Sequence, residues 1–272
     1  MTDKDIKKFI FAHWALKIHD IKKVKDVWQV TDHKHSKYCF KPTEVRKKRT
    51  TFICEAMEHL KSNGFPFSPR LIPAKDNSLF ISQGDEHFIL TPWLKGTRPD
   101  FRDAKQLSLA VKTLALFHLV TKGFKSSLSE KYLKRCGKWP EKLAVRTGQF
   151  HFYRQLIADK PYLTSFDRSF LAHYPWIIAR AEKAKNILTQ ANYHQLASYM
   201  REKRYLCHGD MAERNFIFGN DGIMYMIDFV TCRFDLRVTD LYKLIRRTLK
   251  KCHYNIEVAH FMMKEYESVA PL

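Results

Sequence analysis

A predicted hairpin of two short apolar strands, with polar residues at its open end, constrains the fold of this chain more than any other feature. Its strands are Phe216–Phe218 and Ile223–Ile227, and the Gly-Asn-Asp-Gly sequence between them is a strong turn signal. If the turn is centred on its Asn-Asp pair, Asn215 faces approximately Met226, and Asp228 lies two residues further on, about 7 Å along the strand. An amide oxygen and a carboxylate can therefore approach one cation from different sides.

A further carboxylate, that of Asp210, lies five residues before Asn215, on the loop that leads into the hairpin. Oxygen ligands such as those of Asn215 and Asp228 suit Mg²⁺ bound together with substrate phosphates, rather than zinc. Phosphoryl transfer needs this set, with one carboxylate to accept the hydroxyl proton and an Asn and an Asp to hold the metal against a triphosphate. A His-Gly-Asp tripeptide alone would indicate only a loop. Together with the later Asn and the Ile-Asp-Phe end of the hairpin, it indicates kinase-type ancestry.

The rest of the chain divides into a β-rich part and a helical part. In the first part, we expect helices over residues 4–18 and 43–62, and strands at Val27–Val30, Tyr38–Phe40, Leu79–Ile81 and Phe88–Leu90. After Pro92-Trp93-Leu94-Lys95-Gly96 the pattern becomes helical, over residues 103–120, 141–158, 167–200 and 237–250. We therefore predict an α+β fold with a small β-rich N-terminal lobe, residues 1–93, and a mostly helical C-terminal lobe, residues 94–272.

Composition narrows the class of protein. Lys and Arg number 48 against 28 Asp and Glu, so the net charge is +20, which suggests nucleic acid, an anionic membrane or another acidic partner. We find no basic-aromatic motif, zinc-finger spacing or helix-turn-helix signature, so nucleic acid is not the expected partner. No apolar stretch approaches 18 residues, so we expect no membrane insertion. The N-terminus lacks the pattern of a signal peptide, and the six cysteines are widely spaced, which predicts reduced, mostly buried thiols in a cytoplasmic protein.

The catalytic pattern points to the aminoglycoside phosphotransferase and choline-kinase-like branch of the protein-kinase-like fold. Three further segments resemble the CotS family of spore-coat proteins: Tyr38-Cys39-Phe40-Lys41, Cys136-Gly137-Lys138-Trp139-Pro140, and Asp228-Phe229 with the later Asp235-Leu236 and Asp240-Leu241. This resemblance covers nearly the whole chain. It implies a bilobal kinase-like fold and an ATP cleft between the lobes. It also implies synthesis in the mother-cell cytoplasm, assembly onto the spore coat, and spore-coat proteins as partners.

The resemblance assigns roles to the residues of the predicted site. Asp210 would be the catalytic base, and Asn215 and Asp228 would hold Mg²⁺. We expect His208 to be an orienting or packing residue. Asp240 is expected to brace the catalytic loop or cap a helix rather than bind substrate.

The same resemblance assigns the cofactor-binding residues for ATP. Lys41 would contact the ATP phosphates and pair with Glu55, for which Glu58 is a rival one turn along. The backbone from Thr91 to Leu94, including Trp93, would form a hinge that faces the adenine. The cofactors implied are ATP and Mg²⁺, and the high positive charge suggests an anionic small-molecule substrate.

Three departures from the family pattern leave the function open. The turn Asp32–Lys37 before Lys41 contains no glycine, although a phosphate-covering loop normally uses glycine for close approach. Val230 stands where related sequences often carry an acidic residue or glycine. The chain ends at Leu272, where family members generally continue through further helices, so we expect a shortened C-terminal lobe with apolar surface left for a partner. The chain is therefore an ATP- and Mg²⁺-dependent phosphotransferase, a catalytically weak or inactive coat scaffold that keeps the fold, or, on charge alone, a nucleic-acid binder.

Overall fold

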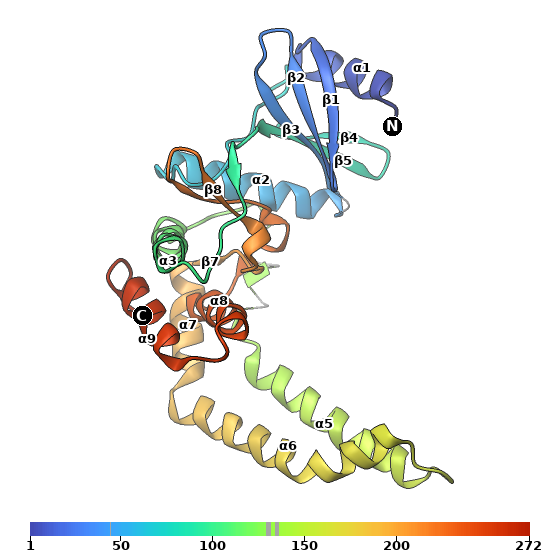
Figure 1. Cartoon of the computed structure of the whole chain (residues 1–272), viewed down its shortest axis with the longest axis vertical. Helices are drawn as coiled ribbons and strands as arrows, with labels where there is room; N and C mark the ends of the chain where they lie inside the picture. The colour runs from blue at the N-terminus through green and yellow to red at the C-terminus, as the bar shows by residue number, and fades with distance from the viewer. Residues whose placement is uncertain (44, 129–131, 134–135) are drawn as a thin grey trace.

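The computed structural model describes residues 1–272 except 44, 129–131 and 134–135. A β-sheet region formed by the N-terminal part of the chain lies above a helical region, and a pair of long helices extends from the lower end (Figure 1). This arrangement confirms the α+β, bilobal fold class. The division at residues 93 and 94 stays a proposal.

The N-terminal sheet has five antiparallel strands in the order β1-β2-β3-β5-β4. Their bounds are β1 Ile18–Val24, β2 Val27–Asp32, β3 Lys37–Thr43, β4 Ile81–Gln83 and β5 Glu86–Pro92. Helix α1, Asp3–Trp14, begins with a capping box between Thr2 and Asp5 and buries Trp14 against the sheet core, where the rings of Phe40 and Phe88 stack 5.1 Å apart.

The expected helix over residues 4–18 is wrong beyond Trp14. Ala15 takes a left-handed φ of 57° and ends α1, and the chain then enters strand β1, which the sequence pattern did not predict. Strand β1 lies at the edge of the sheet and is mostly exposed, so its sequence is polar and lacks the alternation that marks a half-buried strand.

Helix α2, Lys47–Ser62, joins the sheet to the helical lobe (Figure 1). Its apolar face packs into the main core together with Phe124 and Phe234 of the lower lobe, and Phe52 contacts both rings. The helix therefore ties the two lobes together through buried apolar contacts. The core of the sheet itself is separate and smaller.

The helical lobe is built around α3, Ala104–Val120, which packs against α8, Arg237–Lys251, and α9, Ile256–Glu267. Short strands lie between α2 and these helices. They form a sheet of β6 Gly96–Thr97, β8 Phe216–Gly219 and β9 Met224–Met226, and a ladder of β7 Leu206–Cys207 with β10 Arg233–Phe234.

Two long helices, α5 Trp139–Ala158 and α6 Ser165–Gln190, form an arm below this lobe (Figure 1). Helix α7, Tyr193–Lys203, leads back into the lobe, where Tyr193, Ala197 and Met200 join the main core. The predicted single helix over residues 167–200 is broken, because Asn192 adopts a left-handed φ of 49° between α6 and α7. In the described part of the chain, no helix combines the length and apolarity needed to cross a membrane. All six cysteines are free thiols and four of them are buried, as predicted.

Candidate functional site

The predicted hairpin forms, with a register one residue away from the expected one. Phe216 pairs with Met226, and the Ile227 N–H donates to the Asn215 carbonyl over 2.9 Å, so Asn215 faces Ile227 rather than Met226. Asp228 follows immediately, with a left-handed φ of 66°. A non-glycine residue rarely adopts this conformation, but Asp tolerates it better than most. The hairpin therefore brings Asn215 and Asp228 to the same end.

The Asp210 carboxylate lies at this end and is held from two sides. The Asn215 amide nitrogen donates to the Asp210 carbonyl over 2.9 Å and to its Oδ2 over 3.0 Å. Arg214 and Arg247 each contact the carboxylate over 2.8 Å, through Oδ2 and Oδ1 respectively. Partial burial raises the pKa of Asp210, but the Arg247 charge, the Asn215 hydrogen bond and the Arg214 charge outweigh it and hold the pKa below its usual value.

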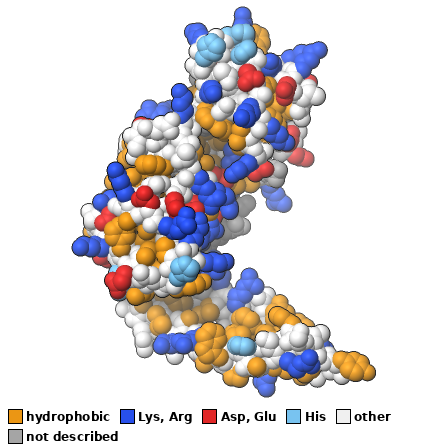
Figure 2. Space-filling view, viewed as in Figure 1, with side chains coloured by type: hydrophobic (Ala, Val, Ile, Leu, Met, Phe, Trp, Pro, Cys, Tyr) orange, Lys and Arg blue, Asp and Glu red, His pale blue; other side chains and the backbone are white. Residues whose placement is uncertain are grey.

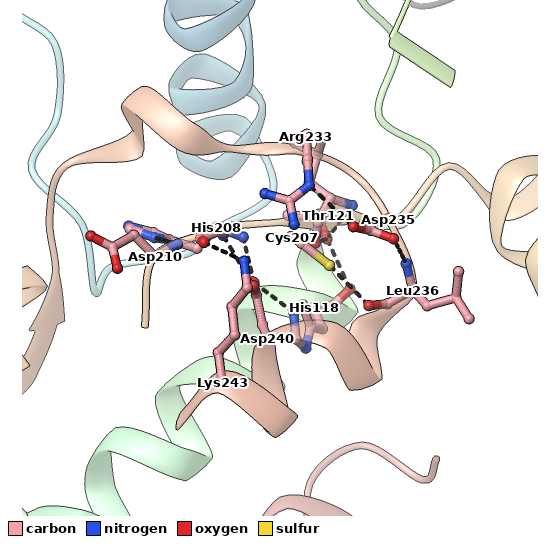
Figure 3. A network of polar contacts seen from close by, with 12 residues as sticks. His118, Thr121, Cys207, His208, Asp210, Arg233, Asp235, Leu236, Asp240 and Lys243 are labelled. Carbon is pink, nitrogen blue, oxygen red and sulfur yellow. Dashed lines mark hydrogen bonds and ion pairs between the residues drawn. The ribbon is translucent and has the colours of Figure 1, made fainter. Parts of the chain in front are cut away.

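A buried polar network supports the loop that carries Asp210 (Figure 3). The Asp240 carboxylate accepts the backbone N–H groups of His208, over 2.5 Å, and Gly209, over 3.0 Å. Lys243 donates to the Gly209 carbonyl over 2.6 Å. The expectation that Asp240 braces the loop that carries Asp210 is confirmed, while a catalytic role for that loop stays a prediction. His118, on α3, lies 3.5 Å from Asp240 and couples this network to the core of the lobe.

His208 is also a packing and orienting residue, as predicted. Its ring is completely buried, with Nε2 2.8 Å from the Ile227 carbonyl and the ring centroid 4.9 Å from that of Phe229. Burial lowers the pKa of His208, which favours the neutral ring. The ring therefore links the loop before the hairpin to the segment after it.

Gly209 is required by the close packing of the same loop. Its φ is +90°, and a Cβ added there would lie 2.5 Å from the Thr231 carbonyl oxygen and 2.7 Å from Arg233 Nη1. Only glycine fits this combination of backbone conformation and close approach.

A cavity of about 180 Å³ lies between the N-terminal sheet and the hairpin. Its walls are mostly apolar and include Val27, Ile89, Ile217 and Ile227. At the polar end, Lys41 Nζ on β3 forms a 2.7 Å ion pair with Asp228 Oδ1, joining residues 187 positions apart. The cleft therefore combines an apolar space with a cation and a carboxylate.

The predicted pair between Lys41 and Glu55 does not form. The Glu55 carboxylate accepts the hydroxyl groups of Ser126 and, over 2.9 Å, Ser127, because this side of α2 faces the loop after α3. Glu58, the rival, contacts Lys61 over 3.1 Å. Lys41 instead lies on the strand opposite Asp228 and pairs with it.

Thr91 and Trp93 both line the cleft, on the segment predicted to be the hinge. Thr91 pairs with Cys39 across the sheet. The Trp93 N–H donates to the Lys37 carbonyl over 2.9 Å, so this amide already has a partner. That the backbone from Thr91 to Leu94 faces the adenine stays a prediction.

The glycine-free turn between β2 and β3 is closed by Asp32. Its Oδ1 accepts the N–H groups of Lys34 and Ser36, each over 2.8 Å, and its carbonyl accepts the His35 N–H over 3.0 Å. The Tyr38 hydroxyl adds a 3.0 Å bond to Oδ2. The amides that would cradle a phosphate in a glycine-rich loop are therefore already occupied.

Arg49 on α2 is a site residue that sequence reasoning missed. Its guanidinium donates to the Val230 carbonyl, over 2.8 Å through Nη2, and to the Cys232 carbonyl, and it stacks 5.2 Å from the Phe52 ring. It therefore holds the segment that follows Asp228 against α2. Among 48 basic residues, nothing local in the sequence distinguishes this arginine.

Comparisons with known proteins agree with this architecture. Residues 7–272 match the family described as "Spore coat putative kinase YutH". The chain is 24% identical to spore coat protein S of Bacillus subtilis (strain 168) over 270 residues, 97% of this chain and 74% of that protein.

Solved structures show the same fold. An aminoglycoside phosphotransferase from Alicyclobacillus acidocaldarius superposes with a TM-score of 0.83 at 18% identity, covering 97% of this chain and 77% of that one. The amicoumacin kinase hAmiN, solved with AMP-PNP, Ca²⁺ and Ami, gives a TM-score of 0.65 at 14% identity over 100% and 79% of the two chains.

Proposed function

Because the chain belongs to the YutH family of spore-coat proteins, we propose that it is a spore-coat-associated phosphotransferase, which moves the γ-phosphoryl group of ATP to a hydroxyl of a small molecule with the help of Mg²⁺. The observation that carries this proposal is the ion pair of Lys41 with Asp228 in the cleft, at the end of the hairpin where Asn215 also binds Asp210. The protein would be made in the mother-cell cytoplasm and assemble onto the coat with other coat proteins.

The donor set at the cleft fits a nucleotide and a hard divalent cation. The apolar walls suit a purine base, and an Asn oxygen with an Asp carboxylate suits Mg²⁺. When bound, Mg²⁺ would neutralise charge on the phosphates. Asn215 and Asp228 would be its ligands, and the Lys41 ammonium would leave its ion pair to contact a phosphate oxygen. Asp210 would accept the proton of the attacking hydroxyl.

A catalytically weak scaffold is the alternative, and the turn closed by Asp32 favours it. Because that carboxylate occupies the backbone N–H groups of Lys34 and Ser36, the turn offers phosphates only side-chain charge. A weaker hold on the triphosphate would follow. In this case the kinase-like fold would serve assembly, and the +20 charge would attract acidic coat proteins.

Thermal unfolding with ATP and Mg²⁺ separates the two functions. Ligand at ten times its Kd stabilises a protein by about 1.4 kcal/mol, which is measurable as a rise in Tm. We expect this rise for the wild type and for Asp221→Ala, which removes an exposed carboxylate from the turn of the same hairpin, but not for Asp228→Ala. Asp210→Ala should retain binding and lose phosphate transfer. If millimolar ATP with Mg²⁺ does not raise the Tm of the wild type, the phosphotransferase proposal is contradicted and the scaffold is the function that stands.

A further inference from the structure

Helix α8 carries a row of basic side chains along the loop that holds Asp210. Lys243, Arg247 and Lys251 are four residues apart, so they share one face of the helix. In that order they contact the Gly209 carbonyl over 2.6 Å, the Asp210 carboxylate over 2.8 Å, and the Glu213 carboxylate. We call these three residues the α8 basic row.

Two arginines from other elements face the same carboxylates. Arg214 contacts Asp210 over 2.8 Å, and Arg98 contacts Glu213 over 3.0 Å. Four cations therefore contact two carboxylates, an excess of two positive charges, and Lys243 adds a fifth cation at the Gly209 carbonyl beside them. Figure 2 shows Lys and Arg side chains gathered around a few acidic ones at the middle of the face in view.

The arginines at Asp210 keep donors for a second partner. A guanidinium has five N–H groups, and the contacts of Arg214 and Arg247 with Asp210 each use Nη2. Their side chains are 61% and 41% exposed, so an incoming group can reach them. Planar guanidinium groups bind phosphate and carboxylate oxygens in pairs, whereas a positively charged substrate would be repelled here.

We propose that the acceptor of the phosphoryl group is an anionic hydroxyl compound, whose phosphate or carboxylate is bound by Arg214 and Arg247. This rests on the proposed phosphotransferase function, because it places the hydroxyl beside Asp210. Binding of the anion draws the guanidinium groups from the Asp210 carboxylate and leaves an oxygen to accept a proton. The hydroxyl oxygen then forms a bond to the γ-phosphorus, the bond to the bridging oxygen of the β-phosphate breaks, ADP leaves, and the proton passes to Asp210.

The test measures anion binding in thermal unfolding, with the nucleotide site saturated by ADP and Mg²⁺. The probes are inorganic phosphate, glycerol 3-phosphate, glycerate, glycerol and choline, so that phosphate, carboxylate, neutral and cationic compounds are compared. We compare the wild type with Arg214→Gln and Arg247→Gln. The matched control is Arg146→Gln on the α5 arm, where an exposed arginine contacts Gln149 over 2.9 Å.

We expect the anions to raise the Tm of the wild type and of Arg146→Gln, and choline and glycerol not to. Each Arg→Gln change in the site should weaken the apparent anion affinity about tenfold, since it removes charge-assisted hydrogen bonds. Stabilisation by glycerol 3-phosphate but not glycerate would assign the subsite to phosphate, and the reverse to carboxylate. Both site variants should fold with Tm values near that of the wild type.

Three results would overturn the inference: no anion-dependent rise up to 20 mM, a rise that both site variants retain, or stabilisation by choline in place of the anions. These results can be distinguished from results that would contradict the proposed phosphotransferase function. If ATP with Mg²⁺ stabilises the protein through Asp228 while anions do not bind, only the acceptor class is wrong. If ATP with Mg²⁺ does not bind, the proposed function falls, and anion binding to Arg214 and Arg247 can still be measured without nucleotide.

Discussion

Replacing Asp240 with Asn tests whether the buried network holds the loop of Asp210 in place. The Asp240 carboxylate is completely buried and accepts two backbone N–H groups, from His208 and Gly209. Burial alone raises the pKa of Asp240, but the His118 ring 3.5 Å away and the positive charge of Lys243 outweigh it and lower the pKa. The ionised carboxylate is therefore the form that the fold stabilises.

The size of the effect follows from these contacts. Asn has the shape of Asp but only one acceptor oxygen, so one backbone N–H would face an amide NH₂. Hydrogen bonds to charged groups contribute about 1.5–3 kcal/mol, and a buried unsatisfied donor costs about 1–3 kcal/mol. Because Asn is neutral, the substitution also removes the cost of burying the Asp240 charge, which offsets part of this loss of stability. We expect Asp240→Asn to lower the free energy of unfolding by about 2–4 kcal/mol.

Urea unfolding followed by circular dichroism measures this loss, with Asp221→Asn as the control. Asp221 also accepts two hydrogen bonds, from the Ile223 N–H over 3.1 Å and the Tyr225 hydroxyl over 2.7 Å, but it is exposed. Because water replaces lost bonds at an exposed site, the control should cost less than about 1 kcal/mol. If Asp240→Asn costs no more than Asp221→Asn, the reasoning that burial makes this carboxylate a structural support is refuted.

Three further outcomes are expected. Lys41→Met should change the free energy of unfolding by less than about 1 kcal/mol, because its ion pair is partly exposed, yet weaken binding of ATP with Mg²⁺ at least about tenfold in calorimetric titration. Gly209→Ala should lower the Tm strongly because its added Cβ meets backbone at 2.5 Å, whereas Gly148→Ala on exposed α5, with open space around it, should leave the Tm unchanged or raise it. Burial lowers the pKa of His118 and His208, so below pH 6.5 the unfolded chain binds protons that the folded rings do not. The free energy of unfolding should therefore be highest above pH 6.5 and fall as the pH decreases below it. The slope is up to about 1.4 kcal/mol per pH unit for each ring, and urea unfolding at pH 7.5 and 5.5 should show a smaller loss for His118→Gln.

Local patterns predicted the parts of the fold that depend on neighbours in sequence. The hairpin β8–β9 and helices such as α2 and α3 follow from turn residues and apolar spacing, so their existence was predictable and only their ends and register were not. The gathering of Asn215 and Asp228 follows from the same hairpin. Strand β1 escaped prediction because an exposed edge strand needs no apolar alternation.

Contacts between elements that lie far apart in the chain could not be predicted from the sequence alone. The partner of Lys41 depends on how β3 lies against the end of β9, and the partner of Glu55 depends on which side of α2 faces the loop after α3. The role of Arg247 likewise needs the placement of α8 beside Asp210. Long charged side chains reach several neighbours, so spacing along one chain does not decide among them when cations are this abundant.

The energetic cost of the arrangement around Asp210, Asp228 and Asp240 favours the proposed phosphotransferase over the proposed scaffold. Asp240 is a completely buried carboxylate, Asp228 takes a left-handed backbone conformation, and Arg214 and Arg247 converge on the single carboxylate of Asp210. Buried charge can often be replaced by apolar packing without loss of stability, and strained backbone costs about 1–3 kcal/mol. The Asp240 carboxylate supports the fold, but a protein that needs only its shape gains nothing from the left-handed backbone at Asp228 or from two arginines on the one carboxylate of Asp210. A protein that must hold a base, a metal-binding carboxylate and an anionic acceptor in one place needs all of them.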